Sequence, residues 1–163
     1  MTRQAIGKIL VVDDEIELKN ALVEGLLKRS FDTRGCTSGR EALDALRTET
    51  FDLLISDLKM PEMDGITLVK AALEIDPGLV VLIMTGQAST QAAEHAQDIG
   101  VFDYVLKPFR LQTLVPILIL AMETRRSREE IANEVEQWRN AAARRVEEKA
   151  DSHVDLRLEG RAS

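Results

Sequence analysis

Short runs of apolar residues recur through the first 124 residues of the chain. Four are strong, at residues 9–12, 53–55, 79–84 and 104–106, and a weaker one covers residues 32–36. The strong runs are rich in branched residues and lack the polar–apolar alternation of a half-exposed strand. Strands covered on both faces show this pattern, which is typical of a parallel sheet.

Between these runs lie segments with the 3.6-residue spacing of amphipathic helices. They cover residues 16–29, 39–47, 66–74, 90–98 and 111–123. Strand and helix therefore alternate five times, at a spacing that suits right-handed crossovers in an open sheet, while a closed eight-unit barrel needs a longer chain. The pattern predicts an α/β fold with a five-stranded, doubly wound parallel sheet.

The rest of the chain differs in kind. Residues 125–163 carry nine basic and nine acidic residues with few large apolar side chains, whereas the first part holds the whole net charge of −7. We predict a domain over residues 1–124 and a charged helical tail over residues 125–163. The tail is too poor in apolar residues to form a second core, so we expect no DNA-reading or catalytic output domain within it.

Two arrangements of the tail remain open. No Gly or Pro occurs between residues 117 and 159, so one long helix is the first arrangement. The second has Arg125 and Arg126 closing the fifth helix, with Ser127 capping a new helix that folds back. Pro116 predicts a local kink early in the fifth helix.

Apolar residues at heptad spacing accompany the long-helix arrangement. They include two residues of the fifth helix and two of the tail, with Thr124 interrupting the series. One consequence is a coiled coil, and with it a homodimer through the fifth helix and the tail. The other is that the tail covers the apolar residues of the fifth helix in its own chain. The residues that we assign to this partner-binding face are Ile117, Leu120, Ile131 and Trp138.

Polar residues stand where the predicted strands end. Asp13 and Asp14 follow the first strand, Asp57 the third, Thr85 the fourth and Lys107 the fifth. Ligands of open α/β sheets bind at the carboxyl ends of the strands. Carboxylates gathered there repel one another unless a cation neutralises them, and an all-oxygen donor set favours Mg²⁺, or Mn²⁺. A carboxylate in this setting can act as the nucleophile of phosphoryl transfer.

Composition narrows the functional classes. The net charge of −7 and six aromatic residues disfavour direct nucleic-acid binding. A single cysteine, Cys36, excludes an internal disulfide and a cysteine-based zinc site. The longest apolar run, at residues 114–122, is about half of what a bilayer requires, and no secretory segment follows the first residues. We therefore expect a cytoplasmic protein that does not bind membranes.

Four segments together resemble the receiver domain of two-component response regulators. They read VDDE at residues 12–15, DLKMPEMDG at 57–65, MTG at 84–86 and YVLKPF at 104–109. The resemblance covers about residues 7–124 and agrees in both order and spacing. It implies the (βα)5 flavodoxin-like fold and phosphoryl transfer from a sensor histidine kinase or a histidine phosphotransfer protein.

The resemblance also implies the metal and phosphoryl ligands. Asp57 is the expected phosphoacceptor, with Asp14 and Asp57 as direct metal ligands and Asp13 as a ligand through water. The backbone carbonyl of Lys59 completes the protein share of the metal shell. Lys107 pairs with the phosphoryl group, and the bond between Lys107 and Pro108 is expected to be cis.

The remaining implied roles concern switching. Thr85 moves to hydrogen-bond the phosphoryl group, and Tyr104 rotates inward as it does. Lys59 and Gln87 tune the lifetime of the phosphoryl group. The fourth helix, fifth strand and fifth helix form the surface that binds partners or a second copy.

Our leading hypothesis is thus a phosphorylation switch whose only chemistry is performed on itself, rather than an enzyme acting on other substrates. Alternatives are a receiver-like scaffold that ignores phosphate, and a regulator whose output domain followed the tail. A phosphatase that works through an aspartyl phosphate is a further alternative. It is disfavoured because the residues 13–15 lack a hydroxyl side chain and the chain has no substrate-covering insertion.

Overall fold

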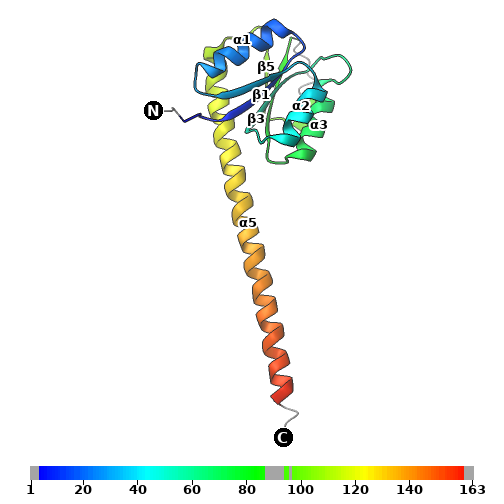
Figure 1. Cartoon of the computed structure of the whole chain (residues 1–163), viewed down its shortest axis with the longest axis vertical. Coiled ribbons are helices and arrows are strands. Elements are labelled where there is room, and N and C mark those ends of the chain that lie inside the picture. The colour runs from blue at the N-terminus through cyan, green and yellow to red at the C-terminus, as the bar shows by residue number, and fades with distance from the viewer. Residues whose placement is uncertain (1–3, 87–93, 96, 160–163) are drawn as a thin grey trace. The chain divides into compact units, whose positions relative to one another are not determined.

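The computed structural model describes residues 4–86, 94, 95 and 97–159, with side chains as far as residue 153. From the first strand to the fourth, strands and helices alternate as predicted, and the fifth strand is followed by a long helix (Figure 1). The strands are β1 (Lys8–Val12), β2 (Asp32–Cys36), β3 (Leu53–Asp57), β4 (Val80–Thr85) and β5 (Asp103–Leu106). The helices are α1 (Ile16–Leu27), α2 (Gly39–Thr48), α3 (Gly65–Ile75) and α5 (Leu111–Glu159). Of the helix predicted at residues 90–98, the described residues 94, 95, 97 and 98 are helical, and the others lie outside the described ranges.

The five strands form one sheet in the order β2-β1-β3-β4-β5, and every neighbouring pair is parallel. This confirms the predicted five-stranded α/β fold. The strand order reverses direction between β1 and β3, and a ligand site is expected beyond the carboxyl ends of the strands at that point.

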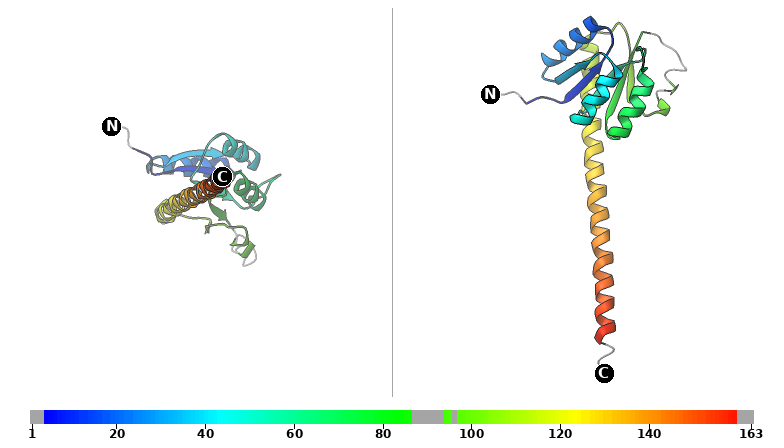
Figure 2. Two further views of the ribbon diagram at one scale, coloured as in Figure 1. Left: turned by 90° about the horizontal axis from the view of Figure 1, so that it is seen from below. Right: turned by 45° about the vertical axis from the view of Figure 1, so that its right-hand side comes forward.

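Successive residues of the central strands pack into two separate cores. In β1, Leu10 and Val12 face a core shared with α2 and α3, while Ile9 and Val11 face one shared with α1 and α5. Side chains alternate across a strand, so a continuous apolar run supplies both faces. Helices accordingly cover both sides of the sheet, with α2 and α3 side by side on one of them (Figures 1 and 2).

The edge strand β5 departs from the expectation of burial on both faces. Tyr104 remains 39% exposed and Leu106 47% exposed, although both belong to an apolar run. The reason is position: β5 pairs only with β4 and ends the sheet. Sequence pattern does not distinguish a buried central strand from an apolar edge strand that presents its side chains to a partner.

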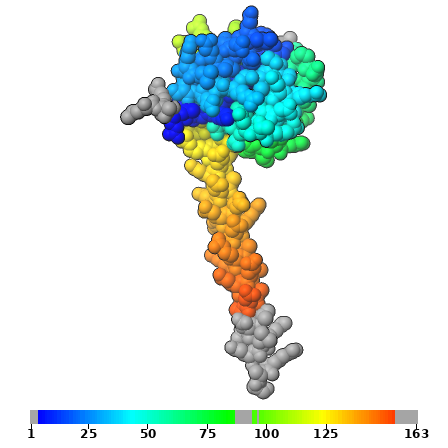
Figure 3. Space-filling view, viewed as in Figure 1, coloured from blue at the N-terminus to red at the C-terminus, as the bar shows by residue number. Residues whose placement is uncertain are grey.

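Helix α5 packs closely on the domain because glycines receive its side chains. A Cβ at Gly25 would lie 2.2 Å from Leu111 Cδ1, and one at Gly7 would lie 2.4 Å from Met122 Sδ. The contact between the start of the chain and this part of α5 is visible in the space-filling view (Figure 3). Met122, Leu114 and Leu118 are buried here, whereas Leu120 remains exposed, which agrees with apolar residues around the whole circumference of the helix.

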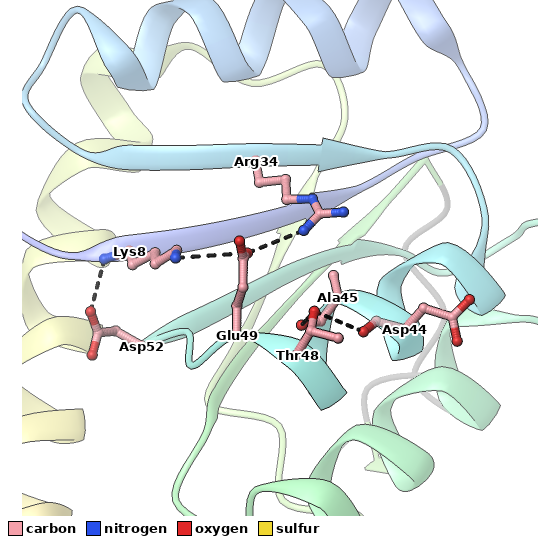
Figure 4. A network of polar contacts seen from close by, with 7 residues as sticks. All are labelled: Lys8, Arg34, Asp44, Ala45, Thr48, Glu49 and Asp52. Carbon is pink, nitrogen blue, oxygen red and sulfur yellow. Dashed lines mark hydrogen bonds and ion pairs between the residues drawn. The ribbon is translucent and has the colours of Figure 1, made fainter.

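Polar contacts tie together the starting ends of the strands. Glu49 accepts a hydrogen bond from Arg34 (3.2 Å) and lies 3.7 Å from Lys8 Nζ (Figure 4). The backbone N–H of Lys8 donates to Asp52 (2.8 Å), which precedes β3. These contacts join β1, β2 and the end of α2 at the edge of the sheet opposite the expected site.

A buried arginine forms a second polar group at this edge. Arg125, 5% exposed, donates from both terminal nitrogens to Asp76, at 3.1 and 2.8 Å, and its Nε lies 4.0 Å from Asp52. Asp76 is the C-cap of α3 and also accepts the N–H of Gly78 (3.0 Å). We call Arg125, Asp76 and Asp52 the Arg125 cluster.

The chain divides into two compact units, Met1–Arg126 and Ser127–Ser163. Helix α5 is uninterrupted across residues 125–127, where one of the two predicted tail arrangements placed a helix boundary. Pro116 lies within α5 without ending it.

Candidate functional site

Three carboxylates meet at the carboxyl ends of β1 and β3. Asp13 and Asp14 follow β1, and Asp57 is the last residue of β3. One carboxylate oxygen from each lies within 4.8 Å of those from the other two. The pairing of β1 with β3 aligns Val12 with Ser56, which brings the residues that follow them to one place.

Lys107 brings an ammonium group to these carboxylates from the end of β5, which is separated from β3 by β4. Its Nζ lies 2.8 Å from Asp13 Oδ2 and 3.4 Å from Asp57 Oδ1. The Lys107 N–H donates to the Thr85 carbonyl (2.8 Å), which continues the pairing of β5 with β4. The bond between Lys107 and Pro108 is cis, as predicted. We call Asp13, Asp14, Asp57 and Lys107 the acidic pocket.

Burial sets the electrostatics of the acidic pocket. Asp13 is completely buried and Asp57 is 7% exposed, whereas Asp14 is exposed. Burial raises the pKa of Asp57, and the charge of Asp13 raises it further against the opposing effect of Lys107. Burial lowers the pKa of Lys107, but the hydrogen bond and charge of Asp13, followed by those of Asp57, outweigh it and raise that pKa. The pocket therefore holds more negative charge than its single ammonium balances.

The loop after Asp57 is held by close backbone contacts. The N–H of Leu58 donates to the Met84 carbonyl (3.0 Å), and that of Gly65 donates to the Leu58 carbonyl (2.9 Å). A Cβ at Gly65 would lie 2.3 Å from the Asp57 carbonyl oxygen, so this position admits only glycine without displacement. Asp64 caps α3 by accepting the Thr67 N–H (2.7 Å), and this bond lowers the pKa of Asp64.

The donor set of the acidic pocket fits a hard divalent cation. Asp13, Asp14 and Asp57 offer only oxygens, and one of the three is exposed enough to leave coordination positions for water or phosphoryl oxygens. Mg²⁺ keeps several waters and binds through one or two carboxylates together with phosphate, which is the arrangement that these residues allow. Lys59, whose carbonyl we predicted as a ligand, is an exposed residue of the same loop.

The two predicted switch residues differ in exposure. Thr85, at the end of β4, is 5% exposed, and Tyr104 on β5 is 39% exposed. Among the described residues, no atom lies within 4 Å of a Cβ built at Gly86, which follows Thr85. Gln87, predicted to tune the phosphoryl lifetime, lies outside the described residues.

The residues predicted for a partner-binding face are mostly exposed. Ile117 is partly buried against the core that α1 and α5 share, while Leu120 is 55% exposed. Ile117, Tyr104, Leu106 and Phe109 line a shallow pocket on the surface of β5 and α5. Ile131 and Trp138, in the second unit, are 61% and 81% exposed.

Gly65 belongs to the site, although we predicted no role for it within the segment DLKMPEMDG. Gly65 is the first residue of α3, and it lies close to the Asp57 carbonyl because α3 begins against the end of β3. The Asp64-Gly65 pair was the available signal, because a capping aspartate followed by a glycine marks a tight approach of loop and helix.

Comparisons with known proteins agree with this geometry. The family model of the response regulator receiver domain matches residues 9–119. The chain is 35% identical over 127 residues to the regulatory protein AtoC of Escherichia coli, and 38% identical over 112 residues to the DNA-binding transcriptional regulator NtrC of Klebsiella pneumoniae. These matches cover 78% and 69% of this chain but 28% and 24% of the relatives, so the chain spans about a quarter of their length.

A solved structure shows the same fold. The chemotaxis protein CheY4 of Vibrio cholerae superposes with a TM-score of 0.67 at 30% identity, covering 71% of this chain and 97% of its own. Among the described residues, no helix is both long and apolar enough to cross a bilayer. By its matching family model, its relatives and its strand-end residues, the chain belongs to the response regulator receiver domain family.

Proposed function

We propose that this protein is a phosphorylation switch that accepts a phosphoryl group on Asp57 from a sensor histidine kinase or a histidine phosphotransfer protein. One observation carries the proposal: three carboxylates lie within 4.8 Å of one another, with the Lys107 ammonium 2.8 and 3.4 Å from two of them. Such a group of charges is suited to neutralising and positioning a transferred phosphoryl group.

The transfer makes one bond and breaks another. A carboxylate oxygen of Asp57 attacks the phosphorus of a phosphohistidine, a P–O bond forms, the P–N bond breaks and the imidazole leaves. The Lys107 ammonium beside Asp57 favours the ionised carboxylate, which is the nucleophilic form. Asp13, Asp14 and Asp57 would hold Mg²⁺ or Mn²⁺, which when bound neutralises charge on the carboxylates and the phosphoryl oxygens.

Phosphorylation adds about one negative charge beside a group that is already acidic. Lys107 is a cation within reach, and Thr85 at the end of β4 offers a hydroxyl donor at the carboxyl ends of the strands. Recruitment of Thr85 changes the space available to Tyr104, which stands on the neighbouring strand and opposite Ile83. The output of the switch is then a changed surface over β5 and α5, which binds a partner or a second copy.

The test is phosphorylation of the full chain with acetyl phosphate and Mg²⁺, followed by intact and peptide mass spectrometry. We expect one phosphoryl group per chain, on the peptide that contains Asp57, and none when Mg²⁺ is chelated. Asp57→Asn abolishes the modification, whereas Asp44→Asn, a change at an exposed carboxylate on α2, leaves it intact. Modification of the Asp57→Asn variant to the same extent would refute the assignment.

The proposal also includes the absence of turnover on external substrates. A phosphatase would release phosphate repeatedly from p-nitrophenyl phosphate, whereas a self-directed switch is modified once and recovers by hydrolysis of its own acyl phosphate. Sustained, Asp57-dependent turnover would favour the phosphatase alternative.

Direct nucleic-acid binding is not part of the proposed function of this chain, because its net charge of −7 opposes contact with phosphates. The longer NtrC relative is named as DNA-binding. Titration of labelled duplex DNA with the phosphorylated chain at low salt tests this: saturable binding would contradict our inference.

A further inference from the structure

An apolar stripe runs along the helix of the second unit. Ile131, Val135 and Trp138 are 61%, 45% and 81% exposed, and Ala142 follows one turn later. Their spacings of four, three and four residues place all four on one face of a helix. We call these residues the tail stripe. Large exposed apolar groups that recur on one helix face indicate a partner surface.

The tail stripe has the spacing of a coiled-coil seam. With Ile131 and Trp138 at heptad position d, Val135 and Ala142 occupy position a. In a parallel two-stranded coiled coil, a d side chain enters a hole formed by two successive a residues, the d residue between them and the following e residue. For Trp138 of a second copy, these residues are Val135, Trp138, Arg139 and Ala142. All four line one shallow pocket on this helix, together with Glu134.

Charges beside the stripe select the parallel orientation. Glu134 occupies position g and Arg139 the following position e, five residues later. Parallel pairing sets Glu134 against Arg139 of the second copy, and symmetry repeats the pair. Antiparallel pairing sets g against g and e against e, which gives Glu134 no cation. Exposed pairs of this kind contribute more to orientation than to affinity.

The stripe is bounded by arginines at seam positions. Arg128 precedes Ile131 at position a, and Arg145 follows Ala142 at position d. In a parallel pair each of these faces its own copy, so like charges meet at both ends. The paired segment is therefore confined to residues 131–142, which is short enough to make association reversible and dependent on concentration.

We propose that residues 131–142 form a parallel, in-register homodimer, with Trp138 of each copy seated among Val135, Arg139 and Ala142 of the other. The partner is a second copy of this chain. Nothing in this contact involves the acidic pocket, so the dimer forms whether or not Asp57 is phosphorylated.

Trp138 is the only tryptophan in the chain and reports directly on the contact. In sedimentation equilibrium, we expect the mass to rise with concentration from 18.2 kDa toward twice that value, with a parallel blue shift of tryptophan emission. Trp138→Ala weakens association at least tenfold, whereas Gln137→Ala, at position c outside the seam, does not. A monomer up to millimolar concentration overturns the proposal, and a blue shift independent of concentration assigns Trp138 to its own chain instead.

Charge exchange tests the pairing of Glu134 with Arg139. Glu134→Arg and Arg139→Glu each place like charges across the seam and weaken association severalfold, and the double variant restores it. Failure of the double variant to recover would exclude the parallel register.

Crosslinking tests orientation in a background that lacks the buried native cysteine, Cys36→Ala. Ile131→Cys is expected to form a disulfide-linked dimer under mild oxidation, because residues at position d meet their own copies in a parallel pair. Asn133→Cys, on the opposite face, serves as the matched control. Equal crosslinking of both would refute the assigned seam. An Asp57→Asn variant should dimerise normally, which separates failure of this proposal from failure of the proposed phosphorylation.

Discussion

The acidic pocket and the Arg125 cluster are two ionic groups at opposite ends of the strands of one sheet, and each contains at least one buried charged side chain. The pocket lies at the carboxyl ends of β1 and β3, and the cluster lies just before the start of β3 and β4. The cluster satisfies one carboxylate with two hydrogen bonds from the planar guanidinium, at 3.1 and 2.8 Å. The pocket instead sets one ammonium against three carboxylates.

The difference shows that charge balance distinguishes an ionic group that stabilises the fold from one that can bind a ligand. A bidentate arginine pair uses both acceptor oxygens and leaves little capacity for a ligand. A lysine is a point charge that moves between acceptors, and the surplus of carboxylate in the pocket favours a cation and then a phosphoryl group. The structural group stabilises the sheet, whereas the chemical group carries electrostatic strain that a ligand relieves.

The largest effect on stability is expected from the Arg125 cluster. Arg125→Met removes the buried partner of a pair in which the Asp76 side chain is 27% exposed. It lowers the free energy of unfolding by about 3 kcal/mol, the lower end of the range for buried pairs, because Asp76 then loses its cation. Chemical denaturation measures this, with Arg126→Met, at the exposed neighbouring residue, as control. Phosphorylation of the folded variant should remain normal. If Arg125→Met lost phosphorylation without losing stability, the Arg125 cluster would have a role in phosphorylation rather than in stability.

A smaller loss is expected where the loop of the acidic pocket touches α3. Gly65→Ala sets a methyl group against the backbone of Asp57 and Leu58 and costs about 2 kcal/mol. It also displaces Asp57, so phosphorylation by acetyl phosphate slows. Gly86→Ala is the matched control, because within the described part of the chain its Cβ meets no atom within 4 Å. Equal stability of the two variants in thermal denaturation would contradict the tight contact at Gly65.

Removing the negative charge of Asp57 from the acidic pocket should increase the stability of the domain. The pKa of Asp57 is raised in the folded chain, first by burial and then by Asp13, so the folded state holds its proton more readily than the unfolded state. This contribution to stability is present below the unfolded pKa and is lost as the pH rises through the folded pKa. Asp57→Asn is therefore expected to stabilise the domain at neutral pH.

The pH profile distinguishes this cause from altered packing. In denaturation series at several pH values, the gain from Asp57→Asn should shrink toward zero in acid, where Asp57 is protonated in both states. A gain that stays constant across the series would point to packing rather than charge.

The smallest effect is expected at an exposed ion pair. Glu24 and Lys28 lie 3.1 Å apart on α1, with side chains 70% and 71% exposed. Glu24→Gln should change stability by less than about 0.5 kcal/mol, because water screens the pair. A larger loss, in the same denaturation assay, would mean that burial is not what distinguishes the two ionic groups from surface pairs.

Much of the fold follows from local sequence pattern. Residues 32–36 were predicted as a strand and form β2 with the same bounds, and the apolar run at residues 9–12 lies within β1. These elements can be predicted from sequence because parallel strands that are covered on both faces need continuous apolar runs. The convergence of Asp13, Asp14, Asp57 and Lys107 was equally accessible, since the carboxyl ends of parallel strands meet at one edge.

The Arg125 cluster had no comparable signal. Asp52, Asp76 and Arg125 lie in connections or near the end of a predicted helix, where charged residues are ordinarily solvated, and their separations of 24 and 49 residues reveal no pattern. Burial of Arg125 depends on where α5 packs against the end of α3 and the residue that precedes β3. The exposure of Tyr104 and Leu106 likewise depends on the place of β5 at the end of the strand order.

By itself, the amino-acid sequence determined the alternation of strands and helices and the kinds of side chain at the strand ends, because both are consequences of periodicity and of chain direction in a parallel sheet. Only the tertiary structure decided which charges are balanced. That outcome depends on distances of a few ångströms between residues far apart in the chain, where Coulomb energy and desolvation change steeply and leave no mark on local sequence.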